Sequence, residues 1–420
     1  MPAVLRDVVL RELRREHGGA SLDTDDVYEV DGPLDLASLT ELPMMSDAAL
    51  CYPPFAGVDP LPRGGALWPL IDERDRLFHH PFDSYDATVV RFFREAAADP
   101  DVTAIKMTVY RAGEKSPIVA SLVDAAAAGK DVVAFVELKA RFDEERNVGW
   151  AKRLEEVGGR VVYGLVGVKN HAKVALVVRR DGKRLRRYVH TGTGNYNSST
   201  AKLYTDVSLL TADEELTADI QDLFNELTGS SRAPGQLTRG CLISPKQLLP
   251  ELLAKVEREA AHARAGRGGH IRMKLNGLSE PDVVSALFRA SQDGVRVELV
   301  VRGVCTLRPG VAGMSENIQV SSVLGRFLEH ARVFCFANAG SPEYYIGSAD
   351  LRPRNLRRRV ELLTPVRDRG CRAQLDTLLD TYLADATAWE LTSAGEYVRR
   401  HGAGPGAQDQ LMGEMAALRS

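Results

Sequence analysis

The most constraining feature of this chain is a short polar signature that occurs twice. In each copy a histidine and a cation lie two residues apart: His171 with Lys173, and His330 with Arg332. A turn of small residues follows each pair, Gly192-Thr193-Gly194-Asn195 in the first copy and Gly347-Ser348-Ala349-Asp350 in the second. Residues two apart on a strand point to the same face of a sheet. Two such copies predict two similar units with one shared active site.

The repeat extends through the flanking segments. Residues 104–107 resemble residues 270–274, and the helical pattern over 116–129 resembles that over 280–294. Residues 131–141 then resemble residues 295–302. Both units close on similar strands, at 207–211 and 360–364. Further helices are expected over 85–97, 147–157, 214–227 and 371–384, and a hairpin at Asp181-Gly182. Ser244 and Pro245 predict the N-cap and first residue of a helix that runs to about 263. Strands that alternate with helices predict an α/β fold with two tandem domains of mixed sheets flanked by helices.

The length of 420 residues suggests two to four domains, at about 100–200 residues each. Residues 1–64 differ from the rest, because an amphipathic helical pattern over 4–16 is followed by a segment rich in Asp, Pro and Gly. We expect a first catalytic domain over 65–235, a second over 236–400 and a flexible tail over 401–420.

Composition narrows the class of protein. No apolar run approaches the roughly 18 residues of a membrane span, and the early charges of Arg6 and Asp7 argue against a signal peptide. The five cysteines are odd in number and lack the spacing of a metal site, which indicates reduced thiols in the cytosol and no structural zinc. A net charge of -3 argues against a generic nucleic-acid coat, although local basic clusters can still hold an anion.

Two histidines, each beside a cation, suit phosphoryl transfer. One neutral imidazole can attack phosphorus while a second donates a proton to the leaving oxygen. Lys173, Arg332 and Asn195 can bind the equatorial oxygens, where charge develops. A lone buried histidine is more often a core residue satisfied by hydrogen bonds, and the repeat is what favours catalysis here.

Several other charged residues are candidates for the site. Arg111 and Arg141 lie at the ends of predicted strands and Arg302 takes the equivalent place in the second unit, although a solvated strand end explains any one of them equally well. A second basic cluster follows the second turn, and we expect part of it to face the substrate. It comprises Arg352, Arg354, Arg357, Arg358 and Arg359, of which Arg354 and Arg359 are the candidates for substrate binding. Glu361 and Asp206 can orient an imidazole, while structural ion pairing explains Asp206 at least as well.

These residues together resemble bacterial polyphosphate kinases of the phospholipase-D-like type. The resemblance covers about 25–399. It is carried by His171 with Lys173, by His190-Thr191-Gly192-Thr193-Gly194-Asn195, by Lys202-Leu203-Tyr204-Thr205-Asp206, by residues 137–144 and by Phe327-Leu328-Glu329-His330.

The resemblance implies reversible transfer of the terminal phosphate of ATP to inorganic polyphosphate, through a phosphohistidine and with Mg²⁺. By position, His171 would be the nucleophile and His330 the acid/base partner that also contacts nucleotide. His190 matches a second histidine, whereas Lys173, Asn195 and Arg332 match the broader superfamily signature. The remaining implied roles are phosphate or magnesium binding by Arg111 and Arg141 and nucleotide contact by Tyr204 and Arg302.

The chain also departs from that family. Relatives carry an N-terminal domain and a head domain, and only a segment like the end of the head domain is present in residues 1–64. Because the missing part supplies adenine contacts and much of the dimer interface in relatives, we expect weak base selectivity and weakened homo-oligomerisation. Asn170 replaces a small apolar or β-branched residue. The expected partners are ATP, ADP and polyphosphate, without nucleic acid or integral membrane association, at a cytoplasmic location that is at most peripheral to the inner membrane.

Three functions remain open from the sequence. A polyphosphate kinase is favoured because Tyr204, Arg302, Arg111 and Arg141 accompany the paired histidines. A phosphodiesterase or nuclease of the phospholipase D superfamily uses the same pair with water as acceptor. A polyanion-binding fragment without turnover is the third.

Overall fold

The computed structural model describes residues 3–16, 30–32, 39, 42, 48–62, 64–109, 116–137, 144–165, 167–229 and 233–417. They belong to two compact units, Met1–Phe55 and Ala56–Ser420. The first unit contains α1 (Ala3–Glu16), which confirms the predicted amphipathic helix, and a short 3-10 helix at Ala48–Leu50. On α1, Val4, Leu5, Val8, Val9 and Leu13 are exposed.

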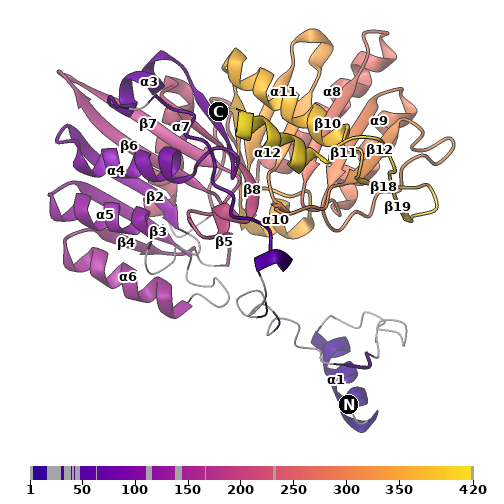
Figure 1. Ribbon diagram of the computed structural model, residues 1–420, viewed down its shortest axis with the longest axis horizontal. Coiled ribbons are helices and arrows are strands. Elements are labelled where there is room, and N and C mark those ends of the chain that lie inside the picture. Colours follow the sequence, from indigo (N-terminus) through magenta and orange to yellow (C-terminus); the bar gives the residue numbers. More distant parts are fainter. Residues whose placement is uncertain are drawn as a thin grey trace. The chain divides into compact units, whose positions relative to one another are not determined.

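The first half of the second unit is built on a mixed sheet (Figure 1). Its strands are β1 (Arg76–His80), β2 (Val102–Val109), β3 (Asp131–Val136), β4 (Arg160–Tyr163), β6 (Val174–Asp181), β7 (Arg184–Gly192) and β8 (Tyr204–Thr211), in the order β1-β8-β7-β6-β2-β3-β4. Its helices are α3 (Leu67–Glu73), α4 (Arg91–Ala98), α5 (Pro117–Ala127), α6 (Glu144–Glu156) and α7 (Glu214–Gly229), with a π-helical turn at Asp86–Val90 before α4.

The second half repeats this plan, and the predicted α/β class with mixed sheets is confirmed. Its sheet runs β19-β18-β12-β11-β10-β14-β15-β17-β9, through β9 (Leu242–Ile243), β10 (His270–Leu275), β11 (Arg296–Val301), β12 (Ile318–Ser322), β14 (Val333–Phe336), β15 (Glu343–Gly347), β17 (Leu362–Val366), β18 (Trp389–Leu391) and β19 (Tyr397–Arg399). Its helices are α8 (Leu248–Arg264), α9 (Pro281–Gln292), α10 (Pro353–Arg358), α11 (Arg369–Leu383) and α12 (Ala407–Ala417). In both sheets three parallel strands adjoin an antiparallel series.

Two short strands cross between the halves. β13 (Leu328–Glu329) pairs in parallel with β8, and β5 (Lys169–Asn170) pairs in parallel with β16 (Arg359–Val360). β5, β13 and β16 end immediately before His171, His330 and Glu361, and β8 contains Asp206. The crossing therefore brings the two signatures together.

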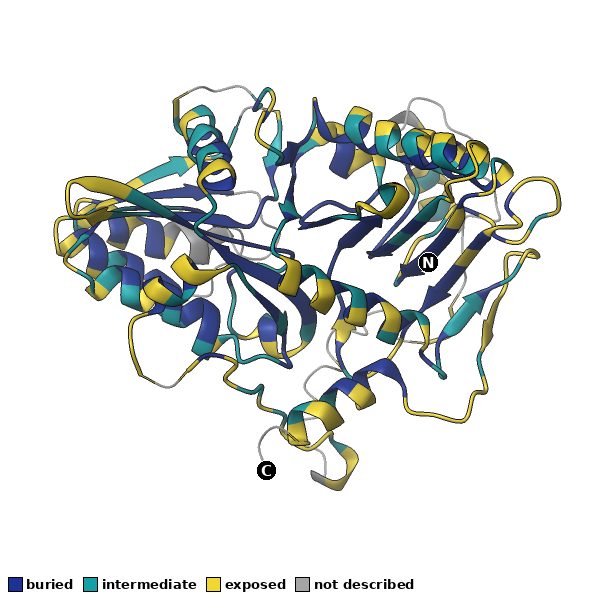
Figure 2. Cartoon of the chain, turned by 90° about the horizontal axis from the view of Figure 1, so that it is seen from above, coloured by how far each residue is buried: buried dark blue, intermediate teal, exposed yellow. Residues whose placement is uncertain are grey.

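Apolar cores form among the described residues of the second unit. One lies between the first sheet and α4, α5 and α6, and another between the second sheet and α8 and α9. The third is shared, because Leu216 and Phe224 of α7 pack with Val360 and Leu362 of the second half. Figure 2 shows buried strands between helices whose outer faces are exposed. The shared core explains why both halves form one compact unit.

Three local expectations need correction. Ser244 does not cap a helix: its hydroxyl donates to Arg359 O and accepts from Glu361 N–H, and α8 begins at Leu248. The strand predicted over 360–364 is divided, because Arg359–Val360 pairs with β5 and only Leu362–Val366 joins the main sheet. The flexible tail expected from residue 401 does not hold for α12, because the buried side chains of Gln408 and Leu411 anchor it.

No helix in the described ranges is both long and apolar enough to cross a membrane. Cys241, Cys305, Cys335 and Cys371 are free thiols.

Gly347 has a steric reason to be glycine, which gives a stability prediction. A Cβ there would lie 1.9 Å from Leu362 O, whereas one at Gly149 in α6 would meet nothing within 4 Å. We expect Gly347→Ala to lower the free energy of unfolding by about 1–3 kcal/mol or more, and Gly149→Ala to raise it by up to about 1 kcal/mol. Urea unfolding of both variants checks this, and equal effects would contradict the steric explanation.

Candidate active site

His171 lies directly after β5, against the second half of the unit. Its backbone N–H donates to Val360 O at 2.8 Å, and its Nδ1 lies 2.8 Å from Oε2 of Glu361. Glu361 is completely buried and also accepts from Asn355 Nδ2 at 2.6 Å. An ionised carboxylate only accepts hydrogen bonds, so Nδ1 of His171 carries the proton and Nε2 carries the lone pair.

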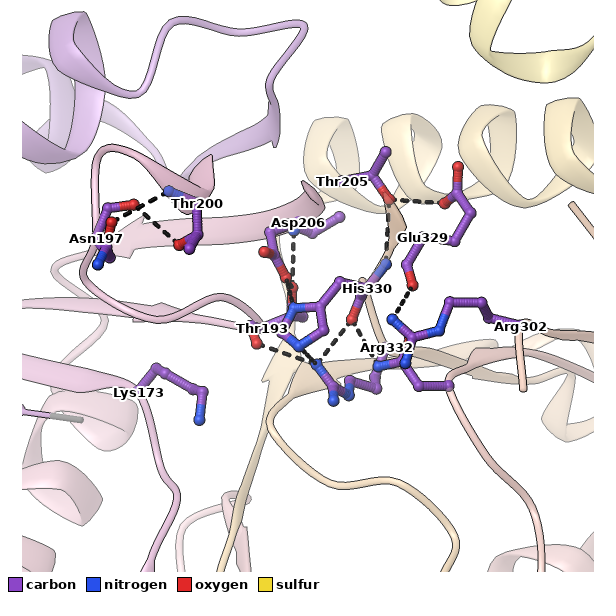
Figure 3. A network of polar contacts seen from close by, with 12 residues as sticks. Lys173, Thr193, Asn197, Thr200, Thr205, Asp206, Arg302, Glu329, His330 and Arg332 are labelled. Atoms are coloured by element: carbon purple, nitrogen blue, oxygen red, sulfur yellow. Dashed lines mark hydrogen bonds and ion pairs between the residues drawn. The ribbon is translucent and has the colours of Figure 1, made fainter. Parts of the chain in front are cut away.

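His330 lies directly after β13 and has the reciprocal arrangement (Figure 3). Its backbone N–H donates to Thr205 O at 3.1 Å, and its Nδ1 lies 2.8 Å from Oδ1 of Asp206. Thr193 Oγ1 donates to the same carboxylate oxygen at 2.6 Å. Each histidine is therefore oriented by a carboxylate from the other half.

The backbone register shows that the two carboxylates are equivalent. Thr193 N–H donates to Val207 O at 2.9 Å in the first half, and Ser348 N–H donates to Leu362 O at 3.0 Å in the second. Each of these strand residues follows a carboxylate, Asp206 or Glu361. The two halves therefore place His171 with Glu361 and His330 with Asp206 by the same backbone plan.

Burial keeps both imidazoles neutral. It lowers the pKa of His171 well below 6.5, and Lys173 and Arg332 lower it further. Burial and Arg332 also lower the pKa of His330, against the opposing effect of Asp206. Although burial alone would raise the pKa of Asp206, His330 and Thr193 hold it below its usual value. Burial raises the pKa of Glu361 to about 7, against the effect of Lys173.

The cations of the two signatures differ in their bonding. Lys173 is 2% exposed, its Nζ donates to His171 O, and burial lowers its pKa to about 7. Arg332 donates to His330 O at 2.7 Å and to Thr193 O at 3.2 Å, and Nη2 lies 3.1 Å from Asp350 Oδ2. Its Nη1 is 3.1 Å from His330 Nε2, which therefore accepts. Arg332 thus contacts both other polar residues of the second signature, His330 and Asp350.

Arg302 and Tyr204 both lie beside His330. Arg302 Nη1 donates to Glu329 O at 3.0 Å, and burial and Arg332 lower its pKa. The ring of Tyr204 is centred 5.3 Å from that of His330. The structure thus brings both of these predicted nucleotide contacts to one side of the pair.

Arg359 and Arg354 belong to the second basic cluster. Arg359 begins β16, and its charge acts on His171, Lys173 and Glu361. Arg354 is exposed, and partial desolvation of its guanidinium together with the charges of Arg352 and Arg359 lowers its pKa. Arg357 instead pairs with Glu280 and Asp282. Arg359 therefore acts on the groups around His171, whereas Arg357 is engaged elsewhere.

Asn195 and His190 have different surroundings. Asn195 Oδ1 is buried and has no hydrogen-bond partner among the described residues. His190 lies in the first core, where Nδ1 is 2.8 Å from Tyr196 OH and the ring packs near Phe92. Its described contacts are therefore with the core rather than with either signature histidine. Burial lowers the pKa of His190 to about 3, and its Nε2 is buried without a hydrogen-bond partner among the described residues.

Arg111 and Arg141 lie outside the described residues. The sequence did not indicate three other residues near the histidines. Asn355 donates to Glu361 and Thr193 donates to Asp206, while Asn276 Nδ2 donates to His330 O at 3.0 Å. Thr193 and Ser348 occupy the same place in the two turns, a signal that the repeat contains. Asn355 and Asn276 carry no such signal, because neither lies within either signature.

The described residues do not fit a protein-bound metal. They contain no group of three histidine, cysteine or acidic side chains with metal-binding geometry. Asp206 and Glu361 each bind a histidine, and Asp350 binds Arg332. The carboxylates nearest the site therefore serve to orient cations and imidazoles.

Comparison with known proteins matches both halves. The family model for polyphosphate kinase C-terminal domain 1 matches residues 66–233, and that for C-terminal domain 2 matches residues 241–410. The polyphosphate kinase of Streptomyces coelicolor is 48% identical over 401 residues, 94% of this chain and 52% of that protein. That of Mycobacterium avium is 49% identical over 424 residues, 99% of this chain and 56% of that protein.

The chain belongs to the polyphosphate kinase family. It spans about half the length of these curated relatives. The crystal structure of polyphosphate kinase from Porphyromonas gingivalis is similar with a TM-score of 0.83 and 33% identity, over 100% of this chain and 63% of that one. The phosphatidylserine synthase of Haemophilus influenzae, at TM-score 0.52 and 11% identity over 83% of this chain and 94% of that one, shares the fold alone. The two halves are thus the tandem phospholipase-D-like domains that the sequence predicts.

The exchanged carboxylates give a prediction that does not depend on turnover. Asp206→Asn removes the negative charge that opposes the lowering of the His330 pKa. We therefore expect the pKa of His330 to fall further, as measured by NMR titration with ¹⁵N-labelled histidine. Asp181→Asn on the exposed hairpin is the control. An unchanged or raised pKa in Asp206→Asn would contradict the assigned contact.

Proposed function

We propose that this chain catalyses reversible transfer of the terminal phosphate of ATP to inorganic polyphosphate, with residues 65–235 and 236–400 as its two catalytic domains. Membership of the polyphosphate kinase family supports the substrate class. The observation that carries the mechanism is the crossed pairing of His171 with Glu361 and His330 with Asp206. It leaves both Nε2 atoms in the lone-pair form at neutral pH.

His171 is the proposed nucleophile. Its Nε2 attacks the terminal phosphorus of ATP, an N–P bond forms, and the bond from phosphorus to the bridging oxygen of ADP breaks. The phosphorylated ring is cationic while Nδ1 keeps its proton. Glu361, 2.8 Å away with a pKa of about 7, stabilises that charge.

His330 is the proposed acid/base group. In the second half reaction the terminal oxygen of polyphosphate attacks the phosphorus on His171, and any proton that it carries passes to Nε2 of His330. The N–P bond then breaks and neutral His171 returns. Arg332 lies 3.1 Å from Nε2 of His330 and holds it in the base form. In the reverse direction, protonated His330 returns the proton to the leaving polymer.

Cations and an amide around the pair bind the phosphates. Lys173, Arg332 and Arg359 neutralise charge on the transferred group, and the side-chain Nδ2 of Asn195 can donate a hydrogen bond to it. Arg302 and Tyr204 contact the nucleotide beside His330, and Arg354 extends the basic path for polyphosphate.

Magnesium is proposed as part of the nucleotide substrate. Mg²⁺ commonly keeps several waters and binds through substrate phosphates rather than in a protein cage. Arg111 and Arg141 are proposed to hold the magnesium-bound phosphates.

The decisive experiment follows the phosphate. ATP labelled at the terminal phosphate is incubated with the chain, with and without polyphosphate. We expect labelled protein, labelled polymer and loss of both in His171→Ala, by at least about 10³-fold because a covalent nucleophile is removed. His401→Ala, an exposed histidine, is the control. Free phosphate or diester cleavage instead would identify a hydrolase, and binding without turnover a polyanion-binding module.

The pKa values of about 7 for Glu361 and Lys173 predict a narrow pH optimum. As pH falls through about 7, Glu361 gains a proton and loses the negative charge that stabilises the phosphorylated His171 ring. As pH rises through about 7, Lys173 loses its charge. The kcat/KM for ATP should therefore form a bell near neutrality. Lys173→Arg should flatten the alkaline limb of this profile. Glu361→Gln should flatten its acid limb and also reduce the activity. Limbs that stay unchanged in these variants would refute the two assignments.

A further inference from the structure

The strand that carries His330 is held weakly by its own backbone. β13 is two residues long, and β8 is its one strand neighbour in the described part of the chain. The backbone contacts are Leu328 N–H to Leu203 O at 2.9 Å and His330 N–H to Thr205 O at 3.1 Å. The position of His330 therefore depends on side chains that fix β13 from elsewhere.

Gln408 of α12 supplies one such contact. Its Oε1 accepts from Phe327 N–H at 2.8 Å, while Nε2 donates to Phe327 O at 2.8 Å and to Glu329 Oε1 at 2.5 Å. A side-chain amide thus makes the donor and acceptor pair that a neighbouring strand would make. Gln408 is 4% exposed, and a Cβ on Gly325 would lie only 2.5 Å from its Oε1.

Glu329 connects Gln408 to the active site. Its Oε2 lies 2.6 Å from Lys274 Nζ and accepts from Thr205 Oγ1 at 2.7 Å. Its backbone carbonyl accepts from Arg302 (Figure 3). Glu329 and Lys274 are both almost fully buried, so loss of a hydrogen-bond partner there is costly. Loss of the Gln408 amide would remove three hydrogen bonds, to Phe327 N–H, Phe327 O and Glu329 Oε1, from the segment that leads to His330.

The first half secures its histidine differently. The residue before His171 is Asn170, whose N–H donates to Oε2 of Glu137 at 3.0 Å. Glu137 belongs to the same half, directly after β3. Gln408, in contrast, comes from a helix whose N-terminus is fixed by Asp385 Oδ2 accepting from Ala407 N–H at 2.7 Å.

We propose that Gln408 is a positioning residue for His330. It fixes β13 through Phe327 and Glu329, and thereby sets the distance and orientation of His330 toward Asp206 and the substrate. The role of this contact in turnover rests on the phosphoryl transfer proposed above, whereas its effect on the His330 imidazole does not.

The test compares Gln408→Met with Gln410→Met. Methionine keeps side-chain length and helix propensity but removes the hydrogen bonds, and Gln410 is exposed on the same helix, where it contacts Glu414. In Gln408→Met we expect kcat to fall on the order of 10- to 100-fold, as for a displaced catalytic group, with a much smaller change in KM for ATP. The Nδ1–H resonance of His330 should broaden or shift. Gln410→Met should match the wild type in both readouts.

Wild-type kcat and an unchanged His330 resonance in Gln408→Met would overturn the proposal. If the wild-type chain transfers no phosphate, the proposed function fails, and the His330 resonance alone still decides the positioning role. If Gln408→Met does not fold, Gln408→Glu takes its place. It keeps the acceptor for Phe327 N–H, loses the donor and sets a carboxylate against Glu329, so a native His330 resonance in that variant would equally overturn the proposal.

Discussion

The rest of the site depends on the exchange of carboxylates between the halves. His171 binds Glu361 and His330 binds Asp206, so each signature histidine takes its carboxylate from the other half. The exchange is geometrically fixed by two short parallel pairings, β5 with β16 and β13 with β8. The first of these pairings adjoins the core shared by the two halves, which includes Val360 of β16. Packing, hydrogen bonding and the protonation state of the imidazoles are thus consequences of one interface.

The repeated backbone carries different chemistry in its two copies. Lys173 lies in the first, and burial brings its pKa to about 7. Arg332 lies in the second, where Asp350 and His330 engage its guanidinium. An arginine remains charged where a buried lysine does not. His171 therefore has a lysine neighbour with a pKa near neutrality, whereas His330 has an arginine beside its Nε2. This difference suits the two histidines to separate roles.

Buried polar groups away from the reacting atoms determine how well these roles are supported. Lys274 and Glu329 are almost completely buried, and removing such charges from water costs free energy unless their partners are well placed. Thr205 and Gln408 provide those partners. The same groups fix β13, so the interactions that stabilise the buried charges also restrict the position of His330.

The sequence by itself determined the two-fold repeat, the α/β class, the histidine and cation pairs and the family, because strand periodicity and short motifs are local properties. It also pointed to Glu361 and Asp206 as orienting carboxylates, but not to which histidine each one binds. Only the tertiary structure decided that His171 meets a residue 190 positions away, that Ser244 bridges strands instead of capping a helix, and that His190 lies in the core. It also showed that part of the tail expected over 401–420 forms the helix α12, in which Gln408 is buried. These outcomes depend on which distant segments pack together, and pairing between segments far apart in the chain leaves no periodicity in the sequence from which it could be read.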